Sequence, residues 1–187
     1  MFTRRSLACL VVSFAILGTA HAQPRHDPLM PAEVDQLRDT AQEPEMRLKL
    51  YVQFTRARLD AVTQVRSDPK VEDKADAIHD RLQDFVDLYD ELDDNVDTYA
   101  DRRDDIRKAL KLVIEADTEF QAKLRAIKDS GSAAPAEAKS YAFVLSNAID
   151  AVDSAAKDHR DLLNEQDELA KQKKLIKPGQ QDAGKGK

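Results

Sequence analysis

Residues 71–99 read VEDKADAIHDRLQDFVDLYDELDDNVDTY, and their apolar side chains recur at alternating spacings of four and three. Two apolar positions in every seven are typical of helices that pack against one another. No Gly or Pro interrupts the chain between Lys70 and Ser130. Because both residues break helices, the stretch predicts long amphipathic helical structure. Its outward positions carry one aspartate per heptad: Asp73, Asp80, Asp87, Asp94 and Asp101.

The same spacing continues beyond residue 99 and is repeated in the last third of the chain. We call the positions that it marks the seam. The first series comprises Val71, Ala75, Ile78, Leu82, Phe85, Tyr89, Leu92, Val96, Tyr99, Arg103, Ile106, Leu110, Val113, Asp117, Phe120, Leu124 and Ile127. The second comprises Tyr141, Leu145, Ala148, Val152, Ala155, His159, Leu162, Gln166 and Leu169. Arg103, Asp117 and His159 are therefore ionisable residues that the pattern places toward a core.

These patterns predict an all-α protein, an up-down-up-down antiparallel four-helix bundle preceded by a short extra helix. The expected helices cover about 44–67, 70–99, 104–129 and 135–173, after a short one at 32–42. The alternative is a three-helix arrangement with one continuous coiled-coil helix over 70–129. That helix would be about 90 Å long, more than a compact domain accommodates, so we favour a turn near residues 100–104.

The short first helix is expected to cover the end of the last one, which is longer than the others. In that arrangement Val34, Leu37 and Ala41 would pack against Leu162, Leu163 and Leu169.

The first 22 residues have the pattern of a secretory signal peptide. Arg4 and Arg5 precede an apolar run, and Ala20-His21-Ala22 provides a small-x-small cleavage site. The run is too short to span a membrane, and we expect no transmembrane segment downstream. The predicted organisation is a signal peptide at 1–22, a flexible linker at 23–31, the bundle at 32–173 and a disordered basic tail at 174–187. We expect a periplasmic or secreted protein, exported by the Sec or the twin-arginine route.

Composition argues against several function classes. The formal charge of −6 is unfavourable for nucleic-acid binding. The single cysteine, Cys9, leaves with the signal peptide, so the mature chain has no thiolate for catalysis, disulfides or metal binding. No serine lies in a Gly-x-Ser-x-Gly elbow, and there is no Gly-rich phosphate loop. We therefore expect a protein that is not an enzyme and has no cofactor.

The acidic stretch 93–104 partly matches a calcium-binding loop. Oxygen donors fall at the spacing that such loops use, on Asp93, Asn95, Asp97, Asp101 and Asp104. Thr98 stands where the sharp turn needs Gly, and Asp104 stands where a bidentate Glu is usual. The competing interpretation is an acidic stripe on the outside of a helix.

The ionisable seam residues are expected to specify helix register rather than to bind a ligand. A buried charge needs a partner, and counting from the turns places Asp117 level with Tyr51 and near Tyr89 and Asn147. The same count places Arg103 level with His159 and near Asp161.

The leading functional hypothesis is an exported, non-enzymatic helical bundle that acts by protein binding or self-association in the cell envelope. The alternative is an envelope binder or sensor of divalent metal that uses the acidic stretch 87–105, with calcium as the candidate ion. The lysine-rich C-terminus is expected to be a fraying end. Its alternative role is a weak contact with an anionic envelope surface.

Overall fold

The computed structural model describes residues 27–130 and 135–176, and this part of the chain is all-α. Its helices are α1 (Pro31–Asp39), α2 (Pro44–Ser67), α3 (Lys74–Asp101), α4 (Arg107–Ser130) and α5 (Pro135–Ile176). The predicted signal peptide, residues 23–26 of the predicted linker and residues 177–187 of the predicted tail lie outside the described residues. Residues 174–176, predicted to be tail, belong to α5. None of the described helices is long and apolar enough to cross a membrane.

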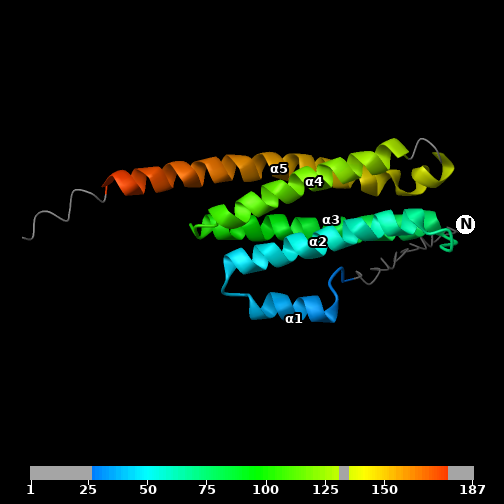
Figure 1. The fold of residues 1–187 in the computed structure, drawn as a ribbon, viewed down its shortest axis with the longest axis horizontal. Coiled ribbons are helices and arrows are strands. Elements are labelled where there is room, and N and C mark those ends of the chain that lie inside the picture. The colour runs from blue at the N-terminus through cyan, green and yellow to red at the C-terminus, as the bar shows by residue number, and fades with distance from the viewer. Residues whose placement is uncertain (1–26, 131–134, 177–187) are drawn as a thin grey trace, which may run out of the picture.

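The four long helices alternate in direction along the chain, which confirms the predicted up-down-up-down bundle (Figure 1). The neighbouring pairs are α2 with α3, α3 with α5, α5 with α4, and α4 with α2. Helices α3 and α4 follow each other in sequence and yet lie diagonally opposite. Their side chains therefore meet across the centre of the core, where the rings of Phe85 and Phe120 form an edge-to-face contact with centroids 5.4 Å apart.

A turn at residues 102–106 separates α3 from α4, so the alternative of one continuous helix over 70–129 is wrong. The amide of Asp104 donates to the carbonyl of Tyr99, and the amide of Arg103 donates to the carbonyl of Ala100. These two bonds form a Schellman motif, which satisfies the last carbonyls of α3. The motif needs a left-handed residue after the helix, and Arg103 supplies it with φ of 62°.

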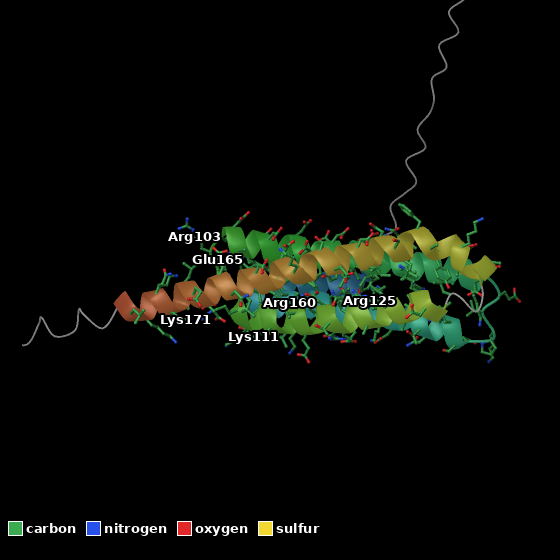
Figure 2. All side chains as sticks on the ribbon, turned by 90° about the horizontal axis from the view of Figure 1, so that it is seen from above. Arg103, Lys111, Arg125, Arg160, Glu165 and Lys171 are labelled. Atoms are coloured by element: carbon green, nitrogen blue, oxygen red, sulfur yellow. The ribbon has the colours of Figure 1, made fainter. Side chains whose placement is uncertain are left out.

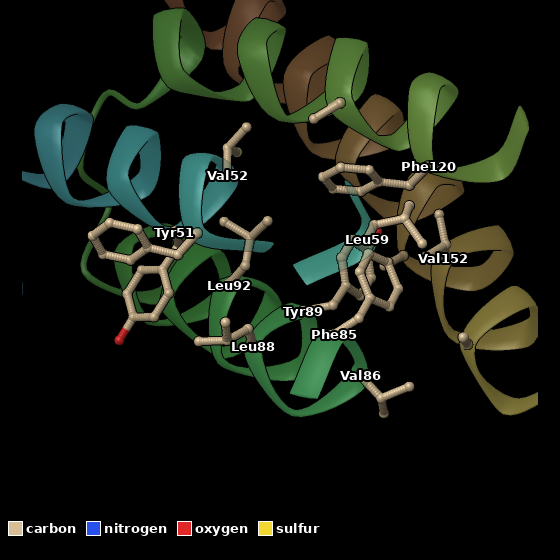
Figure 3. Close-up of a cluster of buried hydrophobic side chains, with 14 of the residues drawn as sticks. Tyr51, Val52, Leu59, Phe85, Val86, Leu88, Tyr89, Leu92, Phe120 and Val152 are labelled. Carbon is tan, nitrogen blue, oxygen red and sulfur yellow. The ribbon is translucent and has the colours of Figure 1, made fainter. Parts of the chain in front are cut away.

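The seam forms the core, as the apolar spacing predicts. From Ile78 to Ile127, every seam position of the first series except Arg103 is buried. Figure 3 shows Phe120 of α4 over Phe85 and Tyr89 of α3, with Leu59 of α2 and Val152 of α5 beside them. Because residues from all four long helices meet there, burial of this stripe holds the bundle together.

Helix α1 lies against α2, on the side of the bundle away from α5 (Figure 1). Arg47 Nη1 of α2 donates to the carbonyl of Leu37 at 2.6 Å, near the C-terminal end of α1. At the other end, Arg58 of α2 binds the Glu33 carboxylate with both terminal nitrogens. The expectation that α1 covers the end of α5 is wrong, and Leu169 is 46% exposed.

Residues 27–30 belong to the predicted flexible linker, and part of that segment is held in place. Arg58 Nε and Nη2 donate to the carbonyl of Pro28, at 3.1 and 2.6 Å. The Glu33 carboxylate, which Arg58 also binds, accepts a bond from the amide of Met30 at 2.8 Å. A single arginine therefore attaches both α1 and the segment before it to the bundle.

Candidate functional site

Two of the three ionisable seam residues meet in the middle of the bundle. Asp117 of α4 is fully buried, and His159 of α5 is 2% exposed. His159 Nδ1 lies 2.9 Å from Asp117 Oδ2, and the Tyr89 hydroxyl of α3 donates to Asp117 Oδ1 at 2.8 Å. The carboxylate thus bonds to two different helices. Each residue reaches this point because it occupies a core-facing position of its own helix.

The second ring nitrogen of His159 faces α3. Its Nε2 lies 3.1 Å from Asp93 Oδ1, an ion-pair contact without the alignment of a hydrogen bond. The Asp93 side chain is 40% exposed, whereas that of His159 is 2% exposed. His159 therefore lies between a buried carboxylate and one that reaches solvent. We call Tyr89, Asp93, Asp117 and His159 the polar centre.

The electrostatics of the polar centre favour a protonated imidazole. Burial disfavours the charged form of His159 and by itself would lower its pKa. The adjacent Asp117 and Asp93 carboxylates have the larger opposite effect and raise the pKa of His159 to about 9. Burial and the charge of Asp117 raise the pKa of the Tyr89 hydroxyl above its usual value of 10. Tyr89 therefore stays protonated and donates, and the imidazolium charge balances the buried Asp117 carboxylate.

Arg103 does not join this group, although the seam count predicts that it does. It lies exposed in the turn between α3 and α4. The seam of α3 ends with the helix at Asp101, so a count through the turn no longer follows one helical surface. The predicted neighbour Asp161 pairs with Lys157, whose Nζ lies 3.1 Å from Asp161 Oδ2.

Of the partners predicted for Asp117, the structure shows Tyr89. Tyr51 instead donates its hydroxyl proton to Glu91 Oε2 at 3.4 Å and lies beside Arg47. The sequence does not predict the bond between Asp117 and His159. Residue spacing shows which face of each helix a side chain lies on, but not how far the helices are shifted along the bundle axis relative to each other. The only sign of this bond in the sequence is that one histidine and one aspartate both occupy seam positions.

The predicted calcium ligands do not form a loop. Residues 93–101 belong to α3, whose 3.6 residues per turn point Asn95 away from Asp93 and Asp97. Asn95 Oδ1 accepts a bond from Arg47 Nε at 3.1 Å, and Asp104 lies beyond the helix in the turn. No group of three or more His, Cys, Asp or Glu residues within residues 27–130 and 135–176 is arranged to hold a metal ion.

The acidic residues of this stretch nevertheless influence one another. Burial, together with the charges of Asp93 and Asp101, raises the pKa of Asp97. Burial and the charges of Asp87, Asp93 and Asp94 raise the pKa of Asp90. Burial and neighbouring negative charges therefore both act on these two carboxylates of α3.

Sequence reasoning also missed the two arginines that hold α1. Arg47 and Arg58 are 11 positions apart in α2, which is close to three full turns and places both on the same side. Their spacing was a signal that could have been read. Their partners, the Leu37 carbonyl and Glu33, had no comparable signal.

Comparisons with known proteins provide no relative from which a function could be transferred. The chain matches no protein-family model, and neither the curated proteins nor the solved structures contain a match to it.

Proposed function

We propose that this protein is exported and acts in the cell envelope as a non-enzymatic helical bundle that binds a protein partner or a second copy of itself. The export proposal rests on residues 1–22, where two arginines are followed by an apolar run and then by a small-x-small cleavage site. Binding rests on one structural observation, which is that α5 continues past the end of the bundle as an exposed helix (Figure 1).

The point where α5 leaves the bundle is defined by its last bonds to the turn and to the start of α4. Gln166 Nε2 donates to the Asp104 carbonyl at 3.1 Å, and Gln166 Oε1 accepts from the Ile106 amide at 3.2 Å. Asp167 pairs with Arg107 at 3.3 Å. Residues 168–176 then extend the helix by a further two to three turns.

This extension, residues 168–176, presents apolar and cationic side chains together. Leu169 is 46% exposed and Leu175 is 80% exposed. Lys171, Lys173 and Lys174 are exposed on the same extension, and Figure 2 shows Lys171 on its projecting end. Covering a leucine that is exposed on an ordered helix with another surface lowers the free energy, because apolar area is removed from water. A protein surface with apolar and acidic groups would fit this end.

The arrangement of the polar centre supports binding rather than catalysis as the role of this chain. Asp117 uses both carboxylate oxygens inside the bundle, for Tyr89 and His159. The imidazole of His159 lies between two carboxylates and is 2% exposed. These groups join helices to one another, whereas the most exposed large apolar side chains of the described residues, Phe143 and Leu175, lie on α5.

Site-specific photo-crosslinking in the native host tests the binding role. A photoreactive phenylalanine analogue replaces Leu175 in the extension or, as a matched control, the exposed Glu115 of α4. We expect Leu175 to form a discrete crosslinked species and Glu115 to form none. Equal crosslinking at both positions, or none at either, would overturn the role assigned to the extension.

Export is tested separately by intact mass and N-terminal sequencing of the protein from the envelope fraction. We expect a chain that begins at Gln23. A chain that keeps residues 1–22 and stays in the cytoplasm would overturn the export proposal and leave the binding result intact.

A further inference from the structure

The most exposed large apolar side chain in the described part of the chain belongs to α5, far from its extension. Phe143 is 87% exposed, whereas the other phenylalanines in this part, Phe54, Phe85 and Phe120, are at most 4% exposed. A phenyl ring in water is unfavourable, and contact with another surface would remove that cost.

An apolar hollow lies next to Phe143, where the end of α4 meets the start of α5. It has a volume of about 140 Å³, and its lining includes Ile127, Ala138, Tyr141 and Leu145. Ala142 and Ser146 also line it, and both are exposed residues next to Phe143 on the helix. An apolar cavity of about 150 Å³ is large enough to bind benzene, so this hollow fits one phenyl ring.

The hollow cannot receive Phe143 of its own chain, because Phe143 points outward from the same helix. It can receive Phe143 of a second copy if two α5 helices pack antiparallel. A two-fold axis between Val144 and Leu145 brings Phe143 opposite Ser146 of the second copy, at the edge of the hollow. The symmetry repeats the contact, so both rings are buried and the assembly closes as a dimer.

The charges next to Phe143 match the same alignment. Lys139 lies one turn before it and Asp150 about two turns after it, both exposed, and neither forms an ion pair with a described residue. The two-fold axis that places Phe143 opposite Ser146 also places Lys139 opposite Asp150 of the second copy. Two such ion pairs would form, and the small side chains of Ala142 and Ser146 allow the helices to approach closely.

We propose that two copies of this chain form a symmetric dimer through antiparallel α5 helices, with Phe143 of each copy packed against the edge of the hollow between α4 and α5 of the other. This inference goes beyond the proposed function, which rests on the extension, and adds a second contact surface whose partner is another copy of the chain. It assigns dimerisation to residues 139–150, whereas the extension at 168–176 stays available for another protein.

Sedimentation velocity of the mature chain over a range of concentrations tests the dimer. We expect a reversible monomer–dimer equilibrium that Phe143→Ser weakens roughly a hundredfold, because two rings lose their burial. Leu112→Ser, which changes an exposed leucine of α4, is the matched control and should leave the equilibrium unchanged. Circular dichroism should show equal helix content in all three chains, because neither side chain belongs to the core.

Charge reversal tests the alignment. Lys139→Asp or Asp150→Lys alone places like charges opposite each other twice and should weaken the dimer. The double variant Lys139→Asp with Asp150→Lys should restore it. The two residues are 11 positions apart on one helix, too far to pair within a chain, so restoration identifies a contact between copies.

Fluorescence provides a second reading of the ring's environment. The protein has no tryptophan, so Phe143→Trp introduces a single reporter. Its emission should shift to shorter wavelength as concentration rises, and the shift should vanish when Lys139→Asp is added. A chain that stays monomeric, a dimer indifferent to Phe143→Ser, or a double reversal without rescue would overturn the proposal. A monomer whose residue 175 still crosslinks to another protein would leave the proposed function standing.

Discussion

His159 Nδ1 lies 2.9 Å from Asp117 Oδ2, although the two residues are 42 positions apart in the chain. The contact joins α5 to α4, and the bond from Tyr89 to Asp117 joins α3 to the same carboxylate. Apolar contacts tolerate a sliding of helices better than a buried ion pair does, because a slip of one turn would leave two charges without partners. The polar centre therefore favours one alignment of three helices.

The first prediction concerns the dependence of stability on pH. The pKa of His159 is about 9 in the folded protein and 6.5 in an unfolded chain, so the folded state holds the proton more tightly. The stabilisation is fully present below pH 6.5 and is lost as the pH rises through 9. This stabilisation amounts to about 3 kcal/mol. Urea unfolding followed by circular dichroism should therefore give a lower free energy of unfolding at pH 9.5 than at pH 6.

The control for this prediction is His79→Gln, which removes an exposed histidine that lies beside Asp80. That variant should keep the same pH dependence. In His159→Leu the free energy of unfolding should no longer fall between pH 6.5 and 9. If it still falls in His159→Leu, the polar centre is not the source of the pH dependence.

A second prediction separates the cost of breaking the polar centre from the cost of replacing it. Asp117→Leu leaves a protonated imidazole buried without its main partner, and the free energy of unfolding should fall by about 3–5 kcal/mol. The double variant Asp117→Leu with His159→Leu has no buried charge at this point. It should recover most of the loss, since apolar residues of similar volume often replace a buried ion pair without penalty. A double variant as unstable as Asp117→Leu would contradict this account.

The turn between α3 and α4 leads to a third prediction. Arg103 adopts φ of 62°, a conformation that strains any side chain with a Cβ. Arg103→Gly should therefore stabilise the protein by about 1 kcal/mol, measured by chemical denaturation. Arg102→Gly is the matched control. Its φ of −73° is helical, so glycine there should give no gain.

A fourth prediction tests the difference between the seam and the outer face of α3. Leu82 is fully buried, and Leu82→Ala should lower the free energy of unfolding by about 2–5 kcal/mol. Asp87 lies on the outer face, where its carboxylate accepts a bond from Gln83, and Asp87→Ala should change stability by less than about 0.5 kcal/mol. Similar values for the two variants would contradict the assignment of the seam to the core.

The sequence was sufficient to predict the features of this fold that depend on one helix at a time. Burial at Ile78, Leu82 and Phe85 follows from apolar spacing alone, because a helix turns by a fixed angle per residue. Asp117 and His159 were placed in the core by the same count. The alternation of direction followed from short connections between long helices.

Features that depend on how helices align with one another could not be predicted in this way. Residue spacing does not show that Asp117 and His159 lie at the same position along the bundle axis. It also does not show that α3 and α4 lie diagonally opposite each other in the bundle. The sequence spacing assigns Asp93 to a calcium loop and gives no sign that its carboxylate lies 3.1 Å from the His159 imidazole. The position of α1 depends on Arg58 and Glu33, 25 residues apart, which no periodic pattern connects.

The last prediction concerns how α1 is held. Arg58 binds Glu33 and the Pro28 carbonyl, and its side chain is only 10% exposed. In Arg58→Met the Glu33 carboxylate would keep only the Met30 amide and would be buried without a positive charge beside it, and α1 can avoid that cost by leaving the surface of α2. Hydrogen exchange should therefore become faster in residues 31–39 while α3, α4 and α5 keep their protection. Arg38→Met removes an exposed pair with Asp35 inside α1 and should leave exchange unchanged. Faster exchange throughout the bundle in Arg58→Met would instead show that Arg58 stabilises the whole fold. Unchanged exchange in α1 would show that Leu37 and Arg47 hold this helix without Arg58.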